Sequence, residues 1–499
     1  MQKKVPIHLI KTGVPGLDTI LGGGLPEFSF NLLAGTPGAG KTTLAHQIMF
    51  SAANAGRRAL YFTVLGEPPL KMLRYQQQFA FFNPDKIGKS IRFVNLASEL
   101  LRGDLSKVLK TILQEVEADS PRLVFVDSFR SIMLATKGHP KGENELQHFV
   151  QELGMHLTSW EATTFLVGEY DEADQSNPIF TVADGLIWLT QDTYQGSMVR
   201  KLEVKKMRGL ATLPGQHTIR ITDEGVRAFP RAILAAPEQT AKAAPARAAM
   251  KRISMGVARL DEMLGGGLPR GYSLLVAGPS GSGKTIMATE FLAEGVRRGE
   301  NGVIAAFEKS PGLGLSMGLS RMVSAGKVAI VSTRALDLSI DATLYEITEA
   351  VHRLKAKRVV IDSLSGFELA LAPSYREDFR DSMYRMISVL TGLGVSVLAT
   401  SELEDRYTDL RFSPYGTAFL TDAIILERYV QLGDELRRCI AVVKVRNSDH
   451  SKELREFKIV KGRLVIGDAI KGYQGLLVGK ASSLHQGTLV GKHDAPKRR

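Results

Sequence analysis

Cysteine is almost absent from this chain of 499 residues, which contains only Cys439. A single cysteine cannot form a disulfide within the chain, so we expect a reducing compartment. One cysteine and ten scattered histidines also do not provide the ligand spacing of a zinc site. No stretch approaches 18 consecutive apolar residues, and residues 1–8 contain no long apolar core of a signal peptide. These absences predict a cytoplasmic protein without a membrane partner.

Acidic residues are outnumbered by basic ones, and the net charge of +12 suggests nucleic-acid binding. Two segments, 231–252 and 480–499, each contain five basic residues and one acidic residue, and together they carry most of the excess. Both segments are polar, and their content of alanine and proline or of glycine and serine is typical of solvated connectors. The chain also has no interleaved stripe of aromatic and basic residues on which bases would stack. The composition therefore argues against nucleic acid as a partner.

Two stretches match the phosphate-binding pattern G-x-x-x-x-G-K-[ST]. Glycines let successive backbone N–H groups point at phosphate oxygens, and the next helix adds its positive N-terminal end. The lysine reaches the β and γ phosphates of ATP, and the threonine hydroxyl joins the Mg²⁺ shell. One match alone could be a glycine-rich turn, but both follow a short apolar run, as a strand–loop–helix unit requires. The expected nucleotide-binding residues are Gly35, Thr36, Pro37, Gly38, Ala39, Gly40, Lys41, Thr42 and Thr43 in the first loop, and Gly278, Pro279, Ser280, Gly281, Ser282, Gly283, Lys284, Thr285 and Ile286 in the second.

The two loops belong to a longer internal repeat. Segment 13–26 returns as 256–269, with the same offset of 243 residues that separates the loops. This period is too long for a solenoid and indicates a tandem duplication. The expected organisation is a first domain at 1–230, a linker at 231–250, a second domain at 251–475 and a flexible basic tail at 476–499.

Each copy alternates short apolar runs with amphipathic segments. Continuous apolar strands separated by helices predict an α/β fold with a mostly parallel sheet covered on both faces, and ligands then bind at the carboxyl ends of the strands. Each copy ends in alternating sequence typical of antiparallel strands, for example at 437–446 and 455–466. Apolar residues three and four apart predict buried helix faces at 146–157 and 379–390. The expected strands include 31–34, 59–65, 91–96, 123–127, 164–167 and 186–189, then 274–277, 303–307, 328–331, 359–362, 395–399 and 424–426.

Each copy offers a carboxylate for Mg²⁺ at a strand end. Asp127 ends the run 123–127 and Asp362 ends the run 358–362, as in Walker B strands. An aspartate at this place can instead cap the following helix, but the loop within the same copy favours metal support. The expected metal ligands are Thr42 with Asp127, and Thr285 with Asp362.

Hydrolysis also needs a carboxylate that orients or deprotonates water. Glu308 follows the run 303–307 and is the candidate in the second copy. The matching place in the first copy is Leu65, and Glu67 lies two residues later, directly before two prolines. The alternative for both acids is a solvated loop position.

A lysine and an arginine stand two residues apart near the end of each copy. They are Lys206 and Arg208 in the first copy, and Lys444 and Arg446 in the second. On a strand such side chains face the same side. Cations that reach the γ-phosphate of a neighbouring subunit would stabilise its charge, although solvated strand charges fit the spacing slightly better.

Taken together, these residues resemble the KaiC family of duplicated RecA-like ATPases, whose best-known members are circadian clock proteins. The resemblance covers roughly residues 8–470. It rests on the leader G-[LV]-x-x-L-D-x-x-L-G-G-G-L-P, the paired loops, the two D-S strand ends and the K-x-R-[GN] segments. It implies tandem RecA-like domains in a hexameric double ring, with ATP at the subunit interfaces and the four cations supplied in trans. It also implies a role in signalling or timing with a protein partner.

The chain departs from the clock members where hydrolysis is concerned. Those members carry a Glu-Glu pair after the strand in both copies, whereas this chain has Leu65-Gly66 and Glu308-Lys309. The resemblance therefore implies hydrolysis mainly in the second copy, where Lys309 would alter the basicity of Glu308.

A second departure concerns autophosphorylation. Clock members phosphorylate an adjacent Ser-Thr pair, and alignment places Ala418-Phe419 there, so that kinase cycle cannot run at these positions. Thr417 and Thr421 flank the pair, either as substitute acceptors or as ordinary polar residues. The stretch 476–499 shows no match to the regulatory tail of clock members, so an activator that binds it is not implied.

Two other functions share this fold. A nucleic-acid-dependent motor of the RecA or DnaB kind is one, because fold alone does not define function. A scaffold that holds ATP without hydrolysing it is the other, suggested by Leu65-Gly66.

Overall fold

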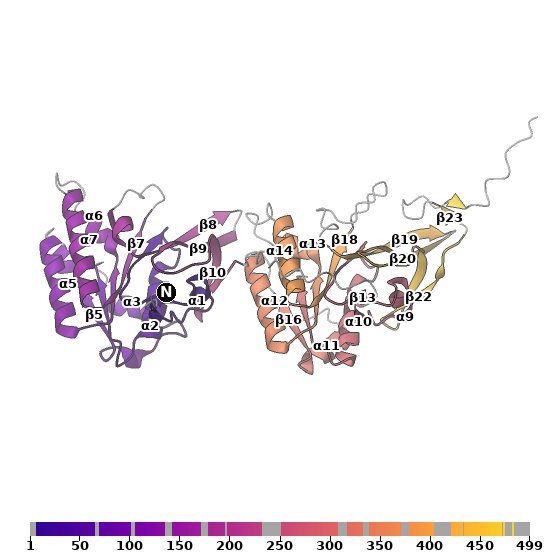
Figure 1. Ribbon diagram of the computed structural model, residues 1–499, viewed down its shortest axis with the longest axis horizontal. Helices are drawn as coiled ribbons and strands as arrows, with labels where there is room; N and C mark the ends of the chain where they lie inside the picture. The colour runs from indigo at the N-terminus through magenta and orange to yellow at the C-terminus, as the bar shows by residue number, and fades with distance from the viewer. Residues whose placement is uncertain are drawn as a thin grey trace, which may run out of the picture. The chain divides into compact units, whose positions relative to one another are not determined.

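The computed structural model describes residues 6–64, 69–100, 105–134, 142–170, 178–194, 197–231, 251–307, 317–332, 339–370, 379–403, 421–432, 434–471, 473–474 and 482–483. The chain divides into two compact units, Met1–Arg231 and Ala232–Arg499. Each unit is built on one nine-stranded sheet with helices packed against it (Figure 1).

In the first unit the strand order is β11-β10-β9-β8-β3-β7-β6-β4-β5. The strands from β8 to β5 in this order run parallel, and β9, β10 and β11 extend the sheet as antiparallel strands. The central strand β3 lies between β7 and β8, which follow it in sequence by more than a hundred residues. The strands are β3 (Phe30–Gly35), β4 (Ala59–Thr63), β5 (Ile91–Asn95), β6 (Leu123–Asp127), β7 (Thr163–Glu169), β8 (Gly185–Tyr194), β9 (Ser197–Met207), β10 (Gln216–Thr222) and β11 (Gly225–Phe229).

The second unit repeats this plan with the order β16-β15-β17-β18-β14-β19-β20-β21-β22. Its central strand β14 has parallel neighbours β18 and β19, and the last three strands are antiparallel. Two mostly parallel sheets with C-terminal antiparallel strands confirm the predicted α/β class. The strands are β14 (Ser273–Gly278), β15 (Gly302–Ala306), β16 (Val328–Ser332), β17 (Arg358–Asp362), β18 (Ser396–Glu402), β19 (Ala423–Leu432), β20 (Glu435–Val445), β21 (Arg455–Val460) and β22 (Arg463–Ala469).

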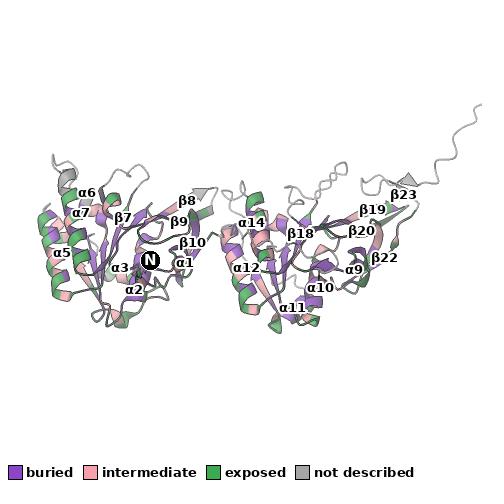
Figure 2. Ribbon diagram, viewed as in Figure 1, coloured by how far each residue is buried: buried purple, intermediate pink, exposed green. Residues whose placement is uncertain are grey.

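Helices cover both faces of each sheet, because consecutive residues of the central strands are buried on opposite sides. In β3, Leu33 packs in a core with residues of α2, whereas Leu32 packs in a separate core with residues of α5 and α7. Figure 2 shows the buried strands between partly exposed helices. The helices of the first unit are α1 (Leu17–Ile20), α2 (Lys41–Ala52), α3 (Pro69–Gln76), the 3-10 helix η1 (Pro84–Lys86), α4 (Ala97–Leu100), α5 (Leu105–Asp119), α6 (Phe129–Leu134), α7 (Gly142–Ser159) and α8 (Pro178–Val182).

The second unit is layered in the same way. Leu275 packs with residues of α12 and α14 on one face, and Leu274 packs with residues of α10 on the other. The helices are α9 (Ala258–Met263), α10 (Lys284–Arg297), α11 (Met317–Ser324), α12 (Ile340–Leu354), α13 (Leu364–Ala370) and α14 (Phe379–Gly392). Three two-stranded sheets complete the described fold: β1 (Leu9–Ile10) with β2 (Leu25–Pro26), β12 (Arg252–Ile253) with β13 (Leu268–Pro269), and β23 (Tyr473–Gln474) with β24 (Ser482–Ser483).

The predicted strands and helix faces are found where the periodicity placed them. Every expected strand overlaps an observed one, with ends that differ by a few residues. The expected apolar faces lie on α7 and α14, and Leu153 and Met386 in these faces are fully buried. Within the part of the chain that the structure describes, no helix combines the length and the apolarity needed to cross a membrane.

Candidate nucleotide sites

Each predicted phosphate loop connects the central strand of its sheet to a helix. In the first unit β3 ends at Gly35 and α2 begins at Lys41, and in the second β14 ends at Gly278 and α10 begins at Lys284. Gly40 and Gly283, directly before the helices, have φ angles of 101° and 134°. Residues with a Cβ rarely adopt such angles, so both loops require glycine here. The backbone N–H groups of each helix start therefore face the loop, as an anion site requires.

The loop lysines are folded into their own loops. Lys41 Nζ donates to the carbonyl oxygen of Thr36 at 2.8 Å, and Lys284 Nζ donates to those of Gly278 and Pro279 at 2.9 and 2.7 Å. Burial lowers the pKa of Lys41, and the carboxylates of Glu169 and Asp127 partly oppose this effect. Each ammonium group thus lies inside the loop that would hold the phosphates.

The predicted metal ligands meet in both units. Thr42 Oγ1 donates to Asp127 Oδ2 at 2.8 Å, and Thr285 Oγ1 donates to Asp362 Oδ2 at 2.9 Å. Mg²⁺ prefers oxygen ligands and usually binds through one or two carboxylates together with substrate phosphates and waters, so these pairs fit it. No group of three or more histidine, cysteine or acidic side chains that could hold a metal occurs among the described residues.

The two aspartates have different second partners, which sequence reasoning missed. Tyr61, on β4, donates its hydroxyl to Asp127 Oδ2 at 2.8 Å. Thr400 donates instead to Oδ1 of Asp362. Its strand, β18, flanks the aspartate strand on the side that corresponds to β7 in the first unit, whereas Tyr61 lies on β4, on the other side. Burial raises the pKa of Asp127, and the hydrogen bonds from Thr42 and Tyr61 partly offset this rise. The apolar run 59–65 gave no sign that one of its members, Tyr61, donates a hydrogen bond to the carboxylate of Asp127.

Sequence reasoning also missed an acid at a second strand end in each unit. Glu169 is paired in register with Gly35, and Glu402 with Gly278, so each glutamate ends the strand next to its loop. The charge of Glu169 raises the pKa of Lys41, which places it within electrostatic reach of the first site. The repetition of a glutamate after matching runs in both copies was a signal that could have found them.

The cations of the first unit lie near the amino end of the central strand, whereas the loop follows its carboxyl end. Lys206 Nζ donates to the carbonyl oxygens of Phe180 and Thr181 at 3.3 and 3.1 Å. Arg208 lies one residue beyond the end of β9, and its guanidinium donates to Asp184 at 2.8 Å. Asp184 also accepts a hydrogen bond from the backbone N–H of Phe30, the first residue of β3. The phosphate loop follows the last residue of β3, so Arg208 and the loop lie at opposite ends of this strand.

The second unit holds its cations in the same way. Lys444 Nζ donates to the carbonyl oxygen of Thr421 at 2.7 Å, and Arg446 donates to Asp422 at 3.3 Å. Asp422 accepts from the backbone N–H of Ser273, the first residue of β14. Burial lowers the pKa of Lys206 and of Lys444, and the neighbouring arginine in each pair adds to the effect. In both units the cations are therefore separated from their own loop by the length of the central strand.

Of the candidate residues around the catalytic acids and the phosphate acceptors, the structure describes Thr421. It is 1% exposed, which leaves its hydroxyl little access to a phosphate donor. The other residues lie outside the described ranges: Glu67, Glu308, Leu65, Gly66, Lys309, Thr417, Ala418 and Phe419.

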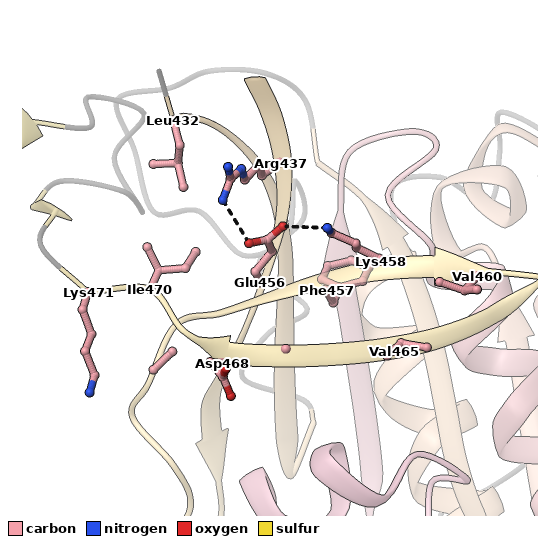
Figure 3. A pocket seen from close by; sticks show the side chains of 12 residues that line it. Leu432, Arg437, Glu456, Phe457, Lys458, Val460, Val465, Asp468, Ile470 and Lys471 are labelled. Atoms are coloured by element: carbon pink, nitrogen blue, oxygen red, sulfur yellow. Dashed lines mark hydrogen bonds and ion pairs between the residues drawn. The ribbon is translucent and has the colours of Figure 1, made fainter. Parts of the chain in front are cut away.

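A hollow on the C-terminal strands of the second unit is not a nucleotide site. It lies against β20, β21 and β22, and none of its lining residues belongs to a phosphate loop. Figure 3 shows Glu456 between Arg437 and Lys458, with ion-pair distances of 3.3 and 3.9 Å. Glu456 is thus already paired with two of the basic side chains that line the hollow.

A glycine-rich loop between a central strand and a helix, with a lysine, a threonine and a strand-end aspartate converging on it, defines a P-loop ATPase of the RecA type, here duplicated. The family model described as "ATPase: KaiC" matches residues 10–233 and again residues 253–470. The chain therefore belongs to the KaiC ATPase family.

The curated relatives are similar over nearly the whole chain. The circadian clock oscillator protein KaiC of Picosynechococcus is 26% identical over 487 residues, covering 94% of this chain and 92% of the relative. The circadian clock protein KaiC3 of Synechocystis is 28% identical over 490 residues, covering 94% of each chain. The KaiC protein of Synechococcus elongatus is 26% identical and covers 94% of this chain and 91% of its own.

Proposed function

We propose that this protein is a cytoplasmic, ATP-hydrolysing hexamer that acts in signalling or circadian-type timing through a protein partner, with hydrolysis mainly in its second domain. Family membership and the names of the clock relatives support this proposal. We further propose residues 1–230 and 251–475 as the two ATPase domains, with 231–250 as the linker and 476–499 as a tail.

The loop and strand-end residues would divide the work of each site. Lys41 and Lys284 would bind the β and γ phosphates, and the threonine–aspartate pairs would hold Mg²⁺. Bound Mg²⁺ would neutralise charge on the phosphates. Glu308 would orient the attacking water in the second domain, and Glu67 is the weaker candidate in the first.

The position of the cations carries the oligomer proposal. Arg208 is tied through Asp184 to the first residue of β3, and the loop begins at the end of this six-residue strand. At about 3.3 Å per residue, roughly 16 Å of strand separates the two. Neither cation pair can therefore serve the phosphates of its own loop, whereas a neighbouring subunit in a ring can present this end of its sheet to the loop.

A complementation experiment tests this arrangement. Subunits with Lys284→Ala have no working second loop, and subunits with Arg446→Ala have no arginine to donate. In mixed rings isolated through two different tags, an intact loop of one subunit meets an intact arginine of the next at about a quarter of the interfaces if mixing is random. We expect this fraction of the second-domain ATPase to return.

The double variant Lys284→Ala/Arg446→Ala, mixed with either single variant, is the matched control and should restore nothing. Mixed rings that stay inactive would contradict supply in trans. Activity of the Arg446→Ala protein alone at the unmodified level would show that the arginine has no role in hydrolysis.

The fate of the γ-phosphate tests the reaction itself. With Mg²⁺ and γ-labelled ATP, we expect free labelled phosphate, a loss of about 100-fold in Glu308→Gln, and little change in the matched variant Glu67→Gln. Label retained on intact ATP favours the scaffold, and turnover that starts only when DNA is added favours the motor. Label fixed on the protein would show an autokinase with other acceptors.

A further inference from the structure

A buried carboxyl group lies under the second phosphate loop. Leu426 on β19 is paired with Ala277 on β14, so the next residue, Glu427, lies beside Gly278 where the loop begins. Glu427 is fully buried, and so is Ser282 within the loop. Ser282 Oγ donates a hydrogen bond to Glu427 Oε2 at 2.7 Å, whereas Oε1 has no hydrogen-bond partner among the described residues.

Glu427 lies close to both ends of the loop, as the space around the two loop glycines shows. A methyl group added at Gly278 would lie 2.9 Å from Glu427 Cβ and 2.8 Å from Ser282 Oγ. One added at Gly283 would lie 3.8 Å from Glu427 Oε2. The carboxyl therefore fills the space beneath the curl of the loop, and its link to Ser282 connects that curl to the sheet.

The first unit has an apolar pair in these places. Leu189 on β8 is paired with Gly35, which makes it the counterpart of Glu427, and Ala39 is the counterpart of Ser282 at the repeat offset. Both Leu189 and Ala39 are fully buried. Two loops with the same backbone arrangement therefore pack against different groups, an apolar pair in the first unit and a hydrogen-bonded polar pair in the second.

Two cationic groups act on Glu427 from the elements packed against it. Lys284 belongs to the loop and α10, and Arg438 belongs to the neighbouring strand β20. Burial raises the pKa of Glu427 to about 7, while the Ser282 hydrogen bond and the charges of Lys284 and Arg438 limit this rise. Near neutral pH the carboxyl is therefore present in both protonation states.

We propose that Glu427 is a positioning residue of the second nucleotide site, which holds the loop through Ser282 and takes up a proton when the phosphates of ATP bind. The proposal rests on the proposed function of this loop as an ATP site. Phosphate charge placed above the loop disfavours a second negative charge below it, so binding shifts the carboxyl toward its neutral form, with the proton on the unpartnered Oε1. The first unit, with Leu189 at this place, has no such coupling.

The sign of the effect follows from proton linkage. Because the bound state holds more protons, ATP binds the second site more tightly as the pH falls toward 7, and the dissociation constant rises above that value. We expect an increase of about three- to tenfold between pH 6 and pH 9, since one proton and a pKa shift of up to about one unit are involved.

The test uses the full chain with one loop disabled. In a Lys41→Ala background, a fluorescent ATP analogue is titrated at several pH values between 6 and 9. Glu427→Gln keeps an acceptor for Ser282 and has no titrating group, so its binding should lose this pH dependence. The analogue's own titration is the same in both proteins and cancels in their ratio.

Two further variants guard against a simple folding defect. Ser282→Ala/Glu427→Leu copies the first unit and should bind the analogue with the same pH profile as Glu427→Gln, in which only the analogue's own titration remains. In a Lys284→Ala background, where only the first loop binds, Glu427→Gln should change nothing, which shows that the first unit is intact.

The outcomes are distinguishable. Parallel pH profiles of the Lys41→Ala protein with and without Glu427→Gln would overturn the inference and leave the proposed function intact. No binding at all in the Lys41→Ala background would overturn the proposed ATP site and the inference with it. For hydrolysis, a pH-dependent difference confined to KM supports positioning, whereas one confined to kcat contradicts it.

Discussion

The two units have equivalent aspartates, Asp127 and Asp362, at the same strand end, but different hydrogen bonds position the two carboxylates. Asp127 receives both of its hydrogen bonds on Oδ2, from Thr42 and from Tyr61. In the second unit the bonds are divided, because Thr285 reaches Oδ2 and Thr400 reaches Oδ1 of Asp362. Duplication has thus preserved the backbone and the loop, while the neighbouring strands supply different donors.

At other places too, equivalent backbone positions of the two units carry different side chains. His46, fully buried on α2, has Thr289 as its counterpart on α10 at the repeat offset. Arg358, buried at the start of β17, has Leu123 as its counterpart on β6. These differences predict that the two units respond differently to pH and to substitution at these places.

Both tryptophans, Trp160 and Trp188, belong to the first unit. Tryptophan fluorescence therefore follows unfolding of the first unit, whereas circular dichroism follows both. Denaturant unfolding without nucleotide, recorded by both signals, can assign a change in stability to one unit.

The largest effect is expected from Arg358→Ala. Arg358 is 1% exposed and donates to Glu300 at 2.9 Å and to the carbonyl oxygens of Ser254 and Phe291, each at 2.8 Å. Removing Arg358 breaks a buried ion pair and leaves Glu300 only its longer contact with Arg270, at 3.6 Å. It also takes the hydrogen-bond donor away from the carbonyl oxygens of Ser254 and Phe291, so the free energy of unfolding of the second unit should fall by about 4 kcal/mol. The circular-dichroism transition should shift while the tryptophan transition stays in place.

The matched control for that substitution is Arg122→Ala in the first unit. Arg122 pairs with Glu161 at the surface, where ion pairs are worth less than about 1 kcal/mol. If Arg122→Ala destabilised its unit as much as Arg358→Ala, burial of the ion pair would not be the cause.

An intermediate effect is expected from pH, through His46. Neither ring nitrogen has a hydrogen-bond partner among the described residues, and burial lowers the pKa of His46 to about 4, partly opposed by the nearby Gln76 amide. The unfolded chain therefore binds more protons between pH 6.5 and 4, and stability falls as the pH is lowered through this window. The loss should reach about 3 kcal/mol for the first unit.

His46→Leu should remove this contribution. The measurement is the tryptophan-detected free energy of unfolding at several pH values, compared between the two proteins. An equal slope in the variant and the unmodified protein would show that His46 does not carry the pH response, since every other titrating group is shared.

The smallest effect is expected from Tyr61→Phe. This change removes the hydroxyl that donates a hydrogen bond to Asp127 and keeps the ring, whose centroid lies 4.7 Å from that of the His46 ring. The free energy of unfolding of the first unit should therefore fall by about 1 kcal/mol. Thr400→Val, the matched change in the second unit, should shift only the circular-dichroism transition by a similar amount. A shift of the tryptophan transition in Thr400→Val would contradict the independence of the two units.

The amino-acid sequence by itself determined the duplication, the strands and the two loops. Each of these features is local, because a glycine needed for a positive φ, a lysine after it and an apolar run before it are written within a dozen residues. The strand-end acids Asp127 and Asp362 could be predicted for the same reason, and the structure places them against Thr42 and Thr285.

Only the tertiary structure decided which side chains meet these loops. Strand order puts β8 and β19 beside the loop strands about 150 residues after them in sequence, and this brings Leu189 under one loop and Glu427 under the other. Ion pairs with Asp184 and Asp422 hold Arg208 and Arg446 near the first residue of the central strand, away from the loop, which no spacing along the chain reveals. Contacts between strands depend on how the whole sheet assembles, because each strand pairs with neighbours that the local sequence does not specify.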